Sequence, residues 1–267
     1  MTGNALPTRT GDQRVTRLRV IRSEWTKLRS LLSTIWCLAA TVALLVGVGV
    51  AYASLRVARP PADPSAFDAT AVSLAGVQLA QFAVGVLGVL FITGEYATGT
   101  IRVSLAAVPD RAVLLWGKAV TFGVAIAGLA VPAVVVTFYA GQAILSAEHL
   151  DTALGAPGVL RAVLGSALFL IAVGLLGLGL GALLRNSAGG ISALFGLLFA
   201  PQLVLGLLPE SMSDAAYRYL PTPAGAAVTA VHSDPVTLGP WTGFGLFCLY
   251  TSVALGLAAW RLRHRDV

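Results

Sequence analysis

Two segments of the chain pair a histidine with carboxylates, the side chains that general acid–base catalysis or a metal site would use. The residues are Glu148, His149 and Asp151 in one segment and Asp214, His232 and Asp234 in the other. Neither spacing matches a known metal-ligand motif, and polar residues of this kind ordinarily lie solvated in loops. The sequence therefore predicts no metal site and no catalytic residue, and a lipid-modifying membrane enzyme is the less favoured interpretation.

The chain also has no residues for nucleotide chemistry. The sequence contains no phosphate-binding loop of the type G-x-x-x-x-G-K-[ST], so the chain is not expected to bind ATP as P-loop proteins do. Cys37 and Cys248 both lie in long apolar runs, which gives neither a disulfide framework nor a zinc motif. We therefore expect this chain to bind no cofactor of its own.

The composition places these residues in a membrane protein. Of the 267 residues, 57% are hydrophobic and 11% are charged, whereas a soluble domain has about 25% charged residues. So large an apolar excess cannot be buried in one soluble core, and it excludes an intrinsically disordered chain. The net charge of +6 would indicate nucleic-acid binding in a soluble protein, but in a membrane protein it needs a different explanation.

Six stretches are long and apolar enough to cross a hydrocarbon core of about 30 Å, which takes roughly 20 residues of helix. They are continuously apolar instead of alternating, which favours helices over strands. The stretches cover residues 34–55, 71–93, 119–140, 159–184, 188–208 and 241–260. The sequence predicts an all-α polytopic membrane protein, with a cytoplasmic N-terminus (1–33), a transmembrane domain of six helices (34–260) and a cytoplasmic tail (261–267).

Between their end turns, the six stretches contain no Asp, Glu, Lys, Arg or His. This absence argues against a proton-coupled transporter, because such transporters carry ionisable residues inside the membrane. Lys118 lies just before the third stretch, and we expect its amine to extend to the membrane surface. Gln78, Gln81 and Gln202 are expected to form hydrogen bonds between helices, with lining of a substrate pathway as the alternative.

Lysine and arginine are distributed unevenly between the two sides that six helices imply. Of the 18, 14 lie in the N-terminus, in the loop 94–118, at Arg185 and in the tail. Because positive residues mark the cytoplasmic side, both termini are predicted to be cytoplasmic, and the net charge is an orientation signal. The longest segment on the other side, 209–240, has a helical spacing of apolar residues from Met212 to Leu220, which indicates a short helix or else a solvated loop.

Residues 14–32, ahead of the first stretch, have the pattern of a basic amphipathic helix. Apolar residues recur at spacings of three and four, among them Leu18, Trp25 and Leu28, which places them on one face of a helix. With arginines and Lys27 on its flanks, such a helix is expected to lie in the lipid headgroups. The alternative is a juxtamembrane segment that only sets the topology.

The connection between the second and third stretches, residues 94–118, is long, since 2–8 residues are usual between helices. Within it Ile101, Leu105 and Val108 would form one apolar stripe of a short helix, with a threonine before it as a cap and Pro109 at its end. An amphipathic helix at a loop tip can dock in a groove of a partner or lie on lipid. The pattern by itself favours neither.

Two motifs resemble the permease subunits of bacterial ABC-2 type exporters. One is RSEWTKLRS, at residues 22–30, and the other is E-x-x-x-G-T-I-R-x-x-L-x-x-x-P-D-R-x-x-x-L-x-x-K, at residues 95–118. The resemblance implies an elbow helix at the first motif and, within the second, a coupling helix that fits a cleft on a separate ATP-binding subunit. The elbow residues are Arg22, Glu24, Trp25, Lys27, Leu28 and Arg29. The coupling residues are Glu95, Gly99, Thr100, Ile101, Arg102, Leu105, Pro109, Arg111 and Lys118.

The resemblance also implies a function for the chain, as the permease subunit of an ATP-driven efflux system in the plasma membrane. It implies a second permease subunit, identical or different, and it assigns ATP and magnesium to the ATP-binding subunit, so this chain is not expected to be an enzyme. The lipid bilayer is a further expected partner, and nucleic acid is not. The alternatives are a non-transporting membrane scaffold or immunity subunit, a secondary transporter, and the lipid-modifying enzyme.

Overall fold

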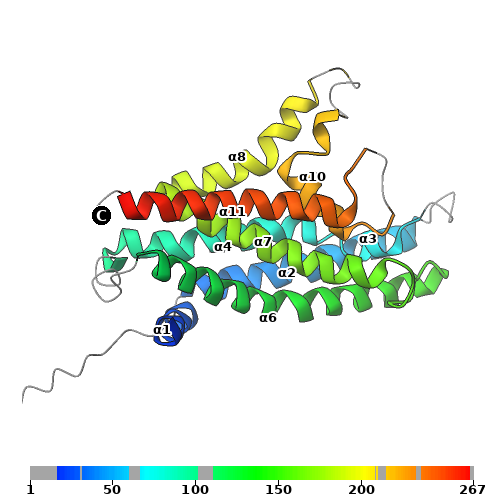
Figure 1. Cartoon of the computed structure of the whole chain (residues 1–267). Coiled ribbons are helices and arrows are strands. Elements are labelled where there is room, and N and C mark those ends of the chain that lie inside the picture. The colour runs from blue at the N-terminus through cyan, green and yellow to red at the C-terminus, as the bar shows by residue number, and fades with distance from the viewer. Residues whose placement is uncertain are drawn as a thin grey trace, which may run out of the picture.

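Every regular element in the described part of the chain is a helix (Figure 1). The computed structural model describes residues 17–264 apart from 31, 60–66, 102–110, 208, 210–214 and 233–235, and it gives no description of the side chains of residues 17–20, 29, 30 and 111. The long helices are α2 (Leu32–Ala58), α4 (Val77–Ala97), α6 (Arg111–Leu145), α7 (Val159–Leu184), α8 (Ser187–Leu205) and α11 (Pro240–His264). The other elements are α1 (Arg17–Ser30), α3 (Ala69–Ser73), α10 (Pro221–Ala226) and the short 3-10 helices η2 (Ser146–Glu148) and η3 (Ala227–Thr229).

The six long helices are each long and apolar enough to cross a membrane. This confirms the predicted all-α fold with six candidate transmembrane helices. Several of them extend beyond the predicted stretches. The longest, α6, has 35 residues, which corresponds to about 52 Å at 1.5 Å per residue, so a part of it must reach beyond a hydrocarbon core of about 30 Å.

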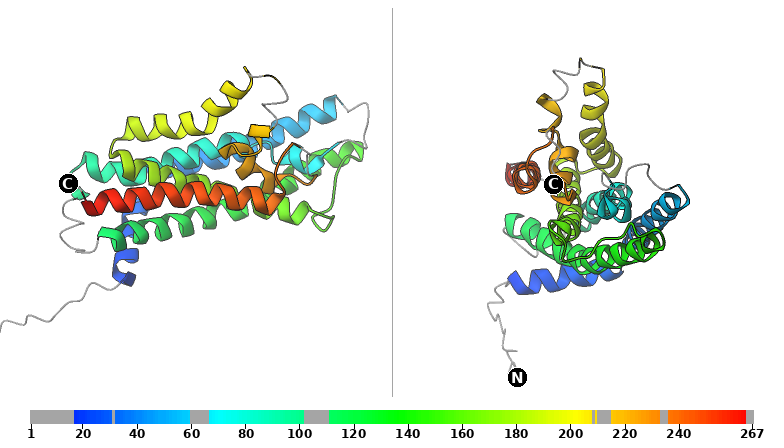
Figure 2. Two further views of the ribbon diagram at one scale, coloured as in Figure 1. Left: turned by 45° about the horizontal axis from the view of Figure 1, so that its top comes forward. Right: turned by 90° about the vertical axis from the view of Figure 1, so that its right-hand side faces the viewer.

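The helix α7 forms the centre of the bundle, and α4, α6, α8 and α11 pack around it (Figure 2). Its closest neighbour is α4. A Cβ atom at Gly88 would lie 2.0 Å from the carbonyl oxygen of Gly174, and a Cβ atom at Gly177 would lie 2.2 Å from that of Gly85. Because no side chain fits at these points, the two helices approach each other through glycine alone. The start of α8 packs on α7 and α4, and its later part diverges from the bundle (Figure 1).

The second predicted stretch, 71–93, differs from the structure because it is two helices instead of one. The chain forms α3, turns at residues 74–76 and begins again as α4. Asp68 caps α3, since its Oδ1 accepts a hydrogen bond from the Ala71 amide at 2.9 Å. At the turn, a Cβ atom on Gly76 would lie 2.1 Å from the carbonyl oxygen of Leu45 in α2. This contact between backbones, which hydropathy does not encode, positions the start of α4 against α2.

The segment 209–240 bears out the predicted short helix in its described part. Residues 215–217 are helical and 218–219 form a turn, whereas Met212 lies outside the described residues. A second short helix that the sequence did not indicate, α10, begins at Pro221. It is held to the bundle by a hydrogen bond from Thr222 Oγ1 to the carbonyl oxygen of Leu198 in α8, at 2.9 Å. Its sequence, PTPAGA, has the composition of a loop, and proline is accepted here because it stands at the first helical position.

The segments that carry most of the lysine and arginine residues gather at one end of the bundle (Figures 1 and 2). We call this the basic end: it comprises α1, the last turn of α4, the first two turns of α6, the α7–α8 turn and the last turn of α11. There α1 crosses the bundle instead of running along it (Figure 2). The opposite end carries α3 and α10 (Figure 1). The division of charge that was predicted along the chain is therefore also a division in space.

Candidate functional site

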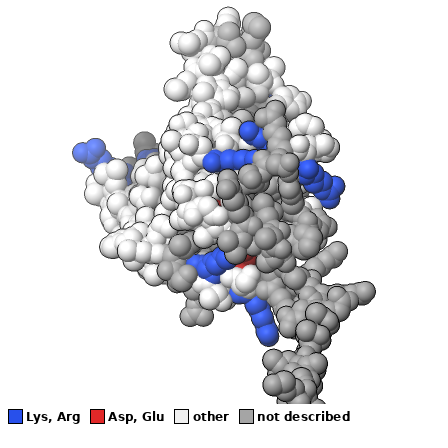
Figure 3. Space-filling view, turned by 90° about the vertical axis from the view of Figure 1, so that its left-hand side faces the viewer, with Lys and Arg blue, Asp and Glu red and all other residues white. Residues whose placement is uncertain are grey.

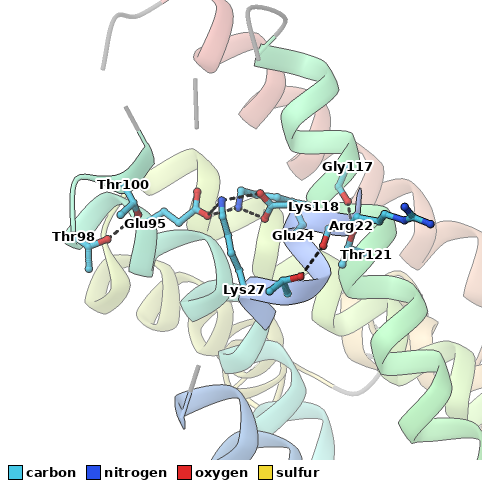
Figure 4. Close-up of polar contacts among 10 residues, drawn as sticks. Arg22, Glu24, Lys27, Glu95, Thr98, Thr100, Gly117, Lys118 and Thr121 are labelled. Carbon is cyan, nitrogen blue, oxygen red and sulfur yellow. Dashed lines mark hydrogen bonds and ion pairs between the residues drawn. The ribbon is translucent and has the colours of Figure 1, made fainter. Parts of the chain in front are cut away.

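Four charged side chains from three helices form one ion network at the basic end (Figure 4). The Lys118 amine of α6 donates to Glu24 Oε2 of α1 at 2.5 Å and to Glu95 Oε1 of α4 at 2.7 Å. The Lys27 amine of α1 donates to Glu24 Oε1 at 2.9 Å and to Glu95 Oε1 at 2.8 Å. Each lysine thus bridges the same two carboxylates, and the four ionised groups together carry no net charge.

The network is mostly buried. The side chains of Lys118 and Glu24 are each 1% exposed, that of Glu95 is 11% exposed and that of Lys27 is 38% exposed. The Lys118 amine also lies 5.2 Å from the centre of the Phe91 ring, close enough for a cation–π interaction. Removing one member of a buried ion pair typically costs about 3–5 kcal/mol, because the other charge stays buried without its partner. The network therefore fixes α1 against α4 and α6.

The network also changes the proton affinity of Lys27, which lies outside the spanning helices. Burial by itself would lower the pKa of this amine, but the hydrogen bonds to Glu95 and Glu24 and the charges of both carboxylates outweigh burial. The pKa of Lys27 therefore lies above its ordinary value of 10.5. Lys27 is consequently a cation throughout the neutral range, as both of its ion pairs require.

The expectation that Lys118 extends its amine to the membrane surface is wrong. Because α6 begins at Arg111, Lys118 lies two turns inside the helix, on the side that faces α1 and α4. There Glu24 and Glu95 hold the amine by hydrogen bonds. The sequence contained one signal for this arrangement. Glu24 lies within the predicted amphipathic helix and Glu95 just after the second stretch, and a buried carboxylate at either place needs a cationic partner.

The predicted elbow residues divide between two faces of α1. Glu24 and Leu28 are buried, whereas Arg22 and Trp25 are exposed and Lys27 is intermediate. Trp25, which the periodicity placed on the apolar face, does not join the protein core, and the exposed ring is typical of an aromatic residue at the lipid–water boundary. The side chain of Arg29 lies outside the description. The sequence pattern therefore identified the helix but not the buried Glu24.

The predicted coupling residues are described only at the edges of their loop. After α4 the chain turns at Gly99, whose φ of 71° is left-handed and favours glycine. The hydroxyls of Thr98 and Thr100 lie 2.8 Å apart, and Ile101 is buried in a small cluster with Leu114. Arg102, Leu105 and Pro109 lie outside the described residues, as does the side chain of Arg111. The coupling helix itself thus stays a prediction.

The three glutamines do not form one polar site in the described part of the chain. Gln81 is buried, and its amide donates to the Gln78 carbonyl oxygen at 2.8 Å within the same helix. The Gln81 Oε1 atom is buried without a hydrogen-bond partner among the described residues. Gln202 is half-buried on α8 and shows no hydrogen bond to the other two. The described contacts of the three glutamines are compatible both with hydrogen bonding between helices and with lining of a substrate pathway, so both interpretations stay predictions.

A second set of polar contacts at the basic end, which the sequence did not indicate, joins α4, α7 and α11. Arg185 ends α7 in a left-handed conformation with a φ of 58°, and its guanidinium lies 5.8 Å from the ring centre of Tyr96 in α4. The Arg261 guanidinium of α11 donates to the carbonyl oxygen of Leu183. These contacts tie the ends of α4, α7 and α11 to one another at the basic end.

At the opposite end, both histidine segments contribute to one cavity of about 470 Å³. Its lining includes His149, Asp151 and His232, together with Asp68, which the sequence analysis did not single out. The closest pair, His232 Nδ1 and Asp68 Oδ2, is 3.8 Å apart, and the His232 side chain is 82% exposed. No group of three possible metal ligands occurs in the part of the chain that was described. The cavity thus holds loosely placed, solvated side chains instead of an ordered acid–base pair.

Comparisons with known proteins identify no relative of this chain. No protein-family model matches the sequence, and no curated protein matches it. The features of the chain that bear on its function are the buried ion network, the six long helices and the two sequence motifs. Of these, the network is the most specific feature, because it joins residues from three helices through charges that are expensive to bury.

Proposed function

We propose that this chain is the permease subunit of an ATP-driven ABC-2 type exporter in the plasma membrane, with its basic end in the cytoplasm. The observation that carries the proposal is the ion network of Glu24, Lys27, Glu95 and Lys118. All four residues belong to the two sequence motifs that resemble these permeases. They join α1, α4 and α6 at the end where a cytoplasmic ATPase would bind.

Energy for transport has to reach such a chain from outside. The sequence has no phosphate-binding loop. Among the described residues, the buried charged side chains are Glu24, Glu95 and Lys118, and all three lie at the basic end instead of the middle of the membrane. Ion-coupled transporters need ionisable groups near the middle. The arrangement therefore favours ATP hydrolysis on a partner over coupling to protons or sodium.

The ion network would transmit a movement of the loop between α4 and α6 to α1. Glu95 lies in the last turn of α4 and Lys118 lies two turns into α6, so these residues flank the loop that would contact the ATPase. A partner that binds the loop differently with and without ATP would bias the permease between two conformations. Lys118 binds Glu24 of α1 directly, and Glu95 is linked to Glu24 through the amines of Lys27 and Lys118. For this reason α1, α4 and α6 would move as one unit.

The test is co-purification with an ATPase. The chain is expressed together with each ATP-binding subunit encoded next to it, and the recovered ATPase and its hydrolysis rate are measured in lipid nanodiscs. Leu105→Asp and Arg111→Ala are expected to reduce recovery strongly, because both residues belong to the predicted coupling segment. Glu148→Gln, an exposed change at the opposite end, is the matched control and is expected to leave recovery unchanged.

Two results would contradict the proposal. One is recovery of no neighbouring ATPase, and the other is undiminished recovery with both loop variants. A membrane scaffold would bind an ATPase without altering its hydrolysis rate, whereas a permease is expected to change the rate. Comparing the rate of the ATPase with and without this chain therefore separates these two functions.

A further inference from the structure

An apolar groove lies between α1 and α6, on the outside of the bundle. Ile21 of α1 forms one wall, and Val113, Trp116, Gly117 and Val120 of α6 form the other. The groove has a volume of about 330 Å³. The Trp116 side chain is 62% exposed, so the groove opens outward and is not part of the protein core.

The groove lies at the depth where lipid headgroups meet acyl chains. It is formed by the first three turns of α6, from Val113 to Val120. This helix of about 52 Å must extend out of a hydrocarbon core of about 30 Å. Four exposed tryptophans lie at the same end, one each on α1, α2, α6 and α11: Trp25, Trp36, Trp116 and Trp260. Exposed tryptophan is typical of the lipid–water boundary.

The charge beside the groove is positive. Arg22, exposed on α1, directly follows Ile21 of the groove wall, and in Figure 4 its side chain points away from the ion network. Glu24 is the carboxylate of α1, and it is buried and bound to Lys118. Among the described residues, the face of the basic end seen in Figure 3 shows lysine and arginine and little acid. The ion network thus removes the negative charge that would otherwise offset Arg22.

We propose that this groove binds one anionic phospholipid, with an acyl chain against Trp116 and Gly117 and its phosphate near Arg22. The apolar wall matches a hydrocarbon chain, and the adjacent guanidinium matches the phosphate in charge and in hydrogen-bonding geometry. A net negative headgroup is favoured over a zwitterionic one because basic residues near the surface attract anionic lipid. The site does not depend on the proposed transport function.

Lipid retention tests the site. The full chain is purified in nanodiscs that contain phosphatidylglycerol and phosphatidylcholine in equal amounts. The sample is then washed stepwise with detergent, and mass spectrometry counts the lipids of each kind that remain bound per chain. The native chain is expected to retain phosphatidylglycerol in preference. Arg22→Gln is expected to weaken that retention about five-fold, the effect of one basic residue near the lipid surface, and Val120→Phe, which fills the groove, is expected to abolish it.

Two matched variants control for general effects. Val124→Phe changes an exposed valine one turn further along α6, outside the groove lining, and Arg263→Gln removes an exposed charge of α11 at the same end. Both are expected to retain lipid as the native chain does. Equal retention of the two lipids by the native chain overturns the proposal. Loss in only one of Arg22→Gln and Val120→Phe also overturns it, because either the groove or the charge then has no part in binding.

Discussion

Lys118→Met tests the role of the buried ion network most directly. Methionine keeps most of the volume of the lysine side chain, so the substitution removes the charge and the hydrogen bonds while largely preserving the packing. It leaves Glu24 without its 2.5 Å partner and Glu95 without its 2.7 Å partner. Lys27 still binds both carboxylates, so the network is weakened but not eliminated.

The expected cost follows from the burial of the two residues. Glu24 and Lys118 are each 1% exposed, and breaking a pair buried to this degree costs about 3–5 kcal/mol. What is lost is the docking of α1, since α4 and α6 have their own contacts with α7. If the whole cost opposes docking, 3–5 kcal/mol corresponds to roughly a hundred-fold to a few thousand-fold change in the docking equilibrium.

Amide hydrogen exchange measures this equilibrium in the full chain. The amides of α1 are expected to exchange faster in Lys118→Met, whereas those in the middle of α7 are expected to be unchanged. The matched control is Lys27→Met, which removes an amine with the same two carboxylate partners and a 38% exposed side chain. Exposed ion pairs contribute only about 0.2–1 kcal/mol, so this variant should accelerate exchange less than about ten-fold.

The comparison between the two lysine variants can refute the reasoning. If Lys27→Met and Lys118→Met accelerate exchange in α1 equally, burial does not determine the strength of these ion pairs. If Lys118→Met leaves the exchange of α1 unchanged, the network does not hold α1 to the bundle. In that case the proposed transmission of movement from the loop to α1 also fails, because it requires α1 to move with α4 and α6.

Three further predictions concern packing, topology and pH. Gly177→Val is expected to prevent stable folding, because its Cβ would lie 2.2 Å from a backbone oxygen of α4. Gly47→Val should be tolerated, because the space around Gly47 is open. The test is whether each purified variant elutes as one monodisperse peak in size-exclusion chromatography. In a chain whose native cysteines are replaced by alanine, His232→Cys should react with a membrane-impermeant maleimide added outside, and His264→Cys should react only after the membrane is opened; labelling of His264→Cys in intact cells would contradict the cytoplasmic basic end. The folded-state pKa of Lys27 is raised, so the stabilisation of α1 docking by this amine is full below the ordinary pKa of 10.5 and is lost as the pH rises through the folded-state pKa. Hydrogen exchange of α1, corrected for its intrinsic pH dependence, should therefore show constant docking between about pH 7 and about pH 9.

The second predicted span, which the structure divides into α3 and α4, differs from its prediction because of a tertiary contact. Residues 71–93 form one mostly apolar run without a charged residue or a proline, and such a run predicts one continuous helix. The turn at 74–76 comes instead from the contact of Gly76 with the backbone of α2 at Leu45. A contact of this kind depends on which helices become neighbours, and the periodicity of one segment contains no such information.

By itself the sequence determined that the protein has six long apolar helices, an amphipathic helix before them and an uneven division of positive charge. These properties are local, because a spanning helix needs only about 20 consecutive apolar residues and charge can be counted along the chain. Only the tertiary structure decided that Lys118 is buried and paired with Glu24, which lies 94 residues earlier. The physical reason is that a lysine near the membrane boundary can extend its amine to solvent or pair it with a carboxylate, and which of these occurs depends on the helix that packs over it.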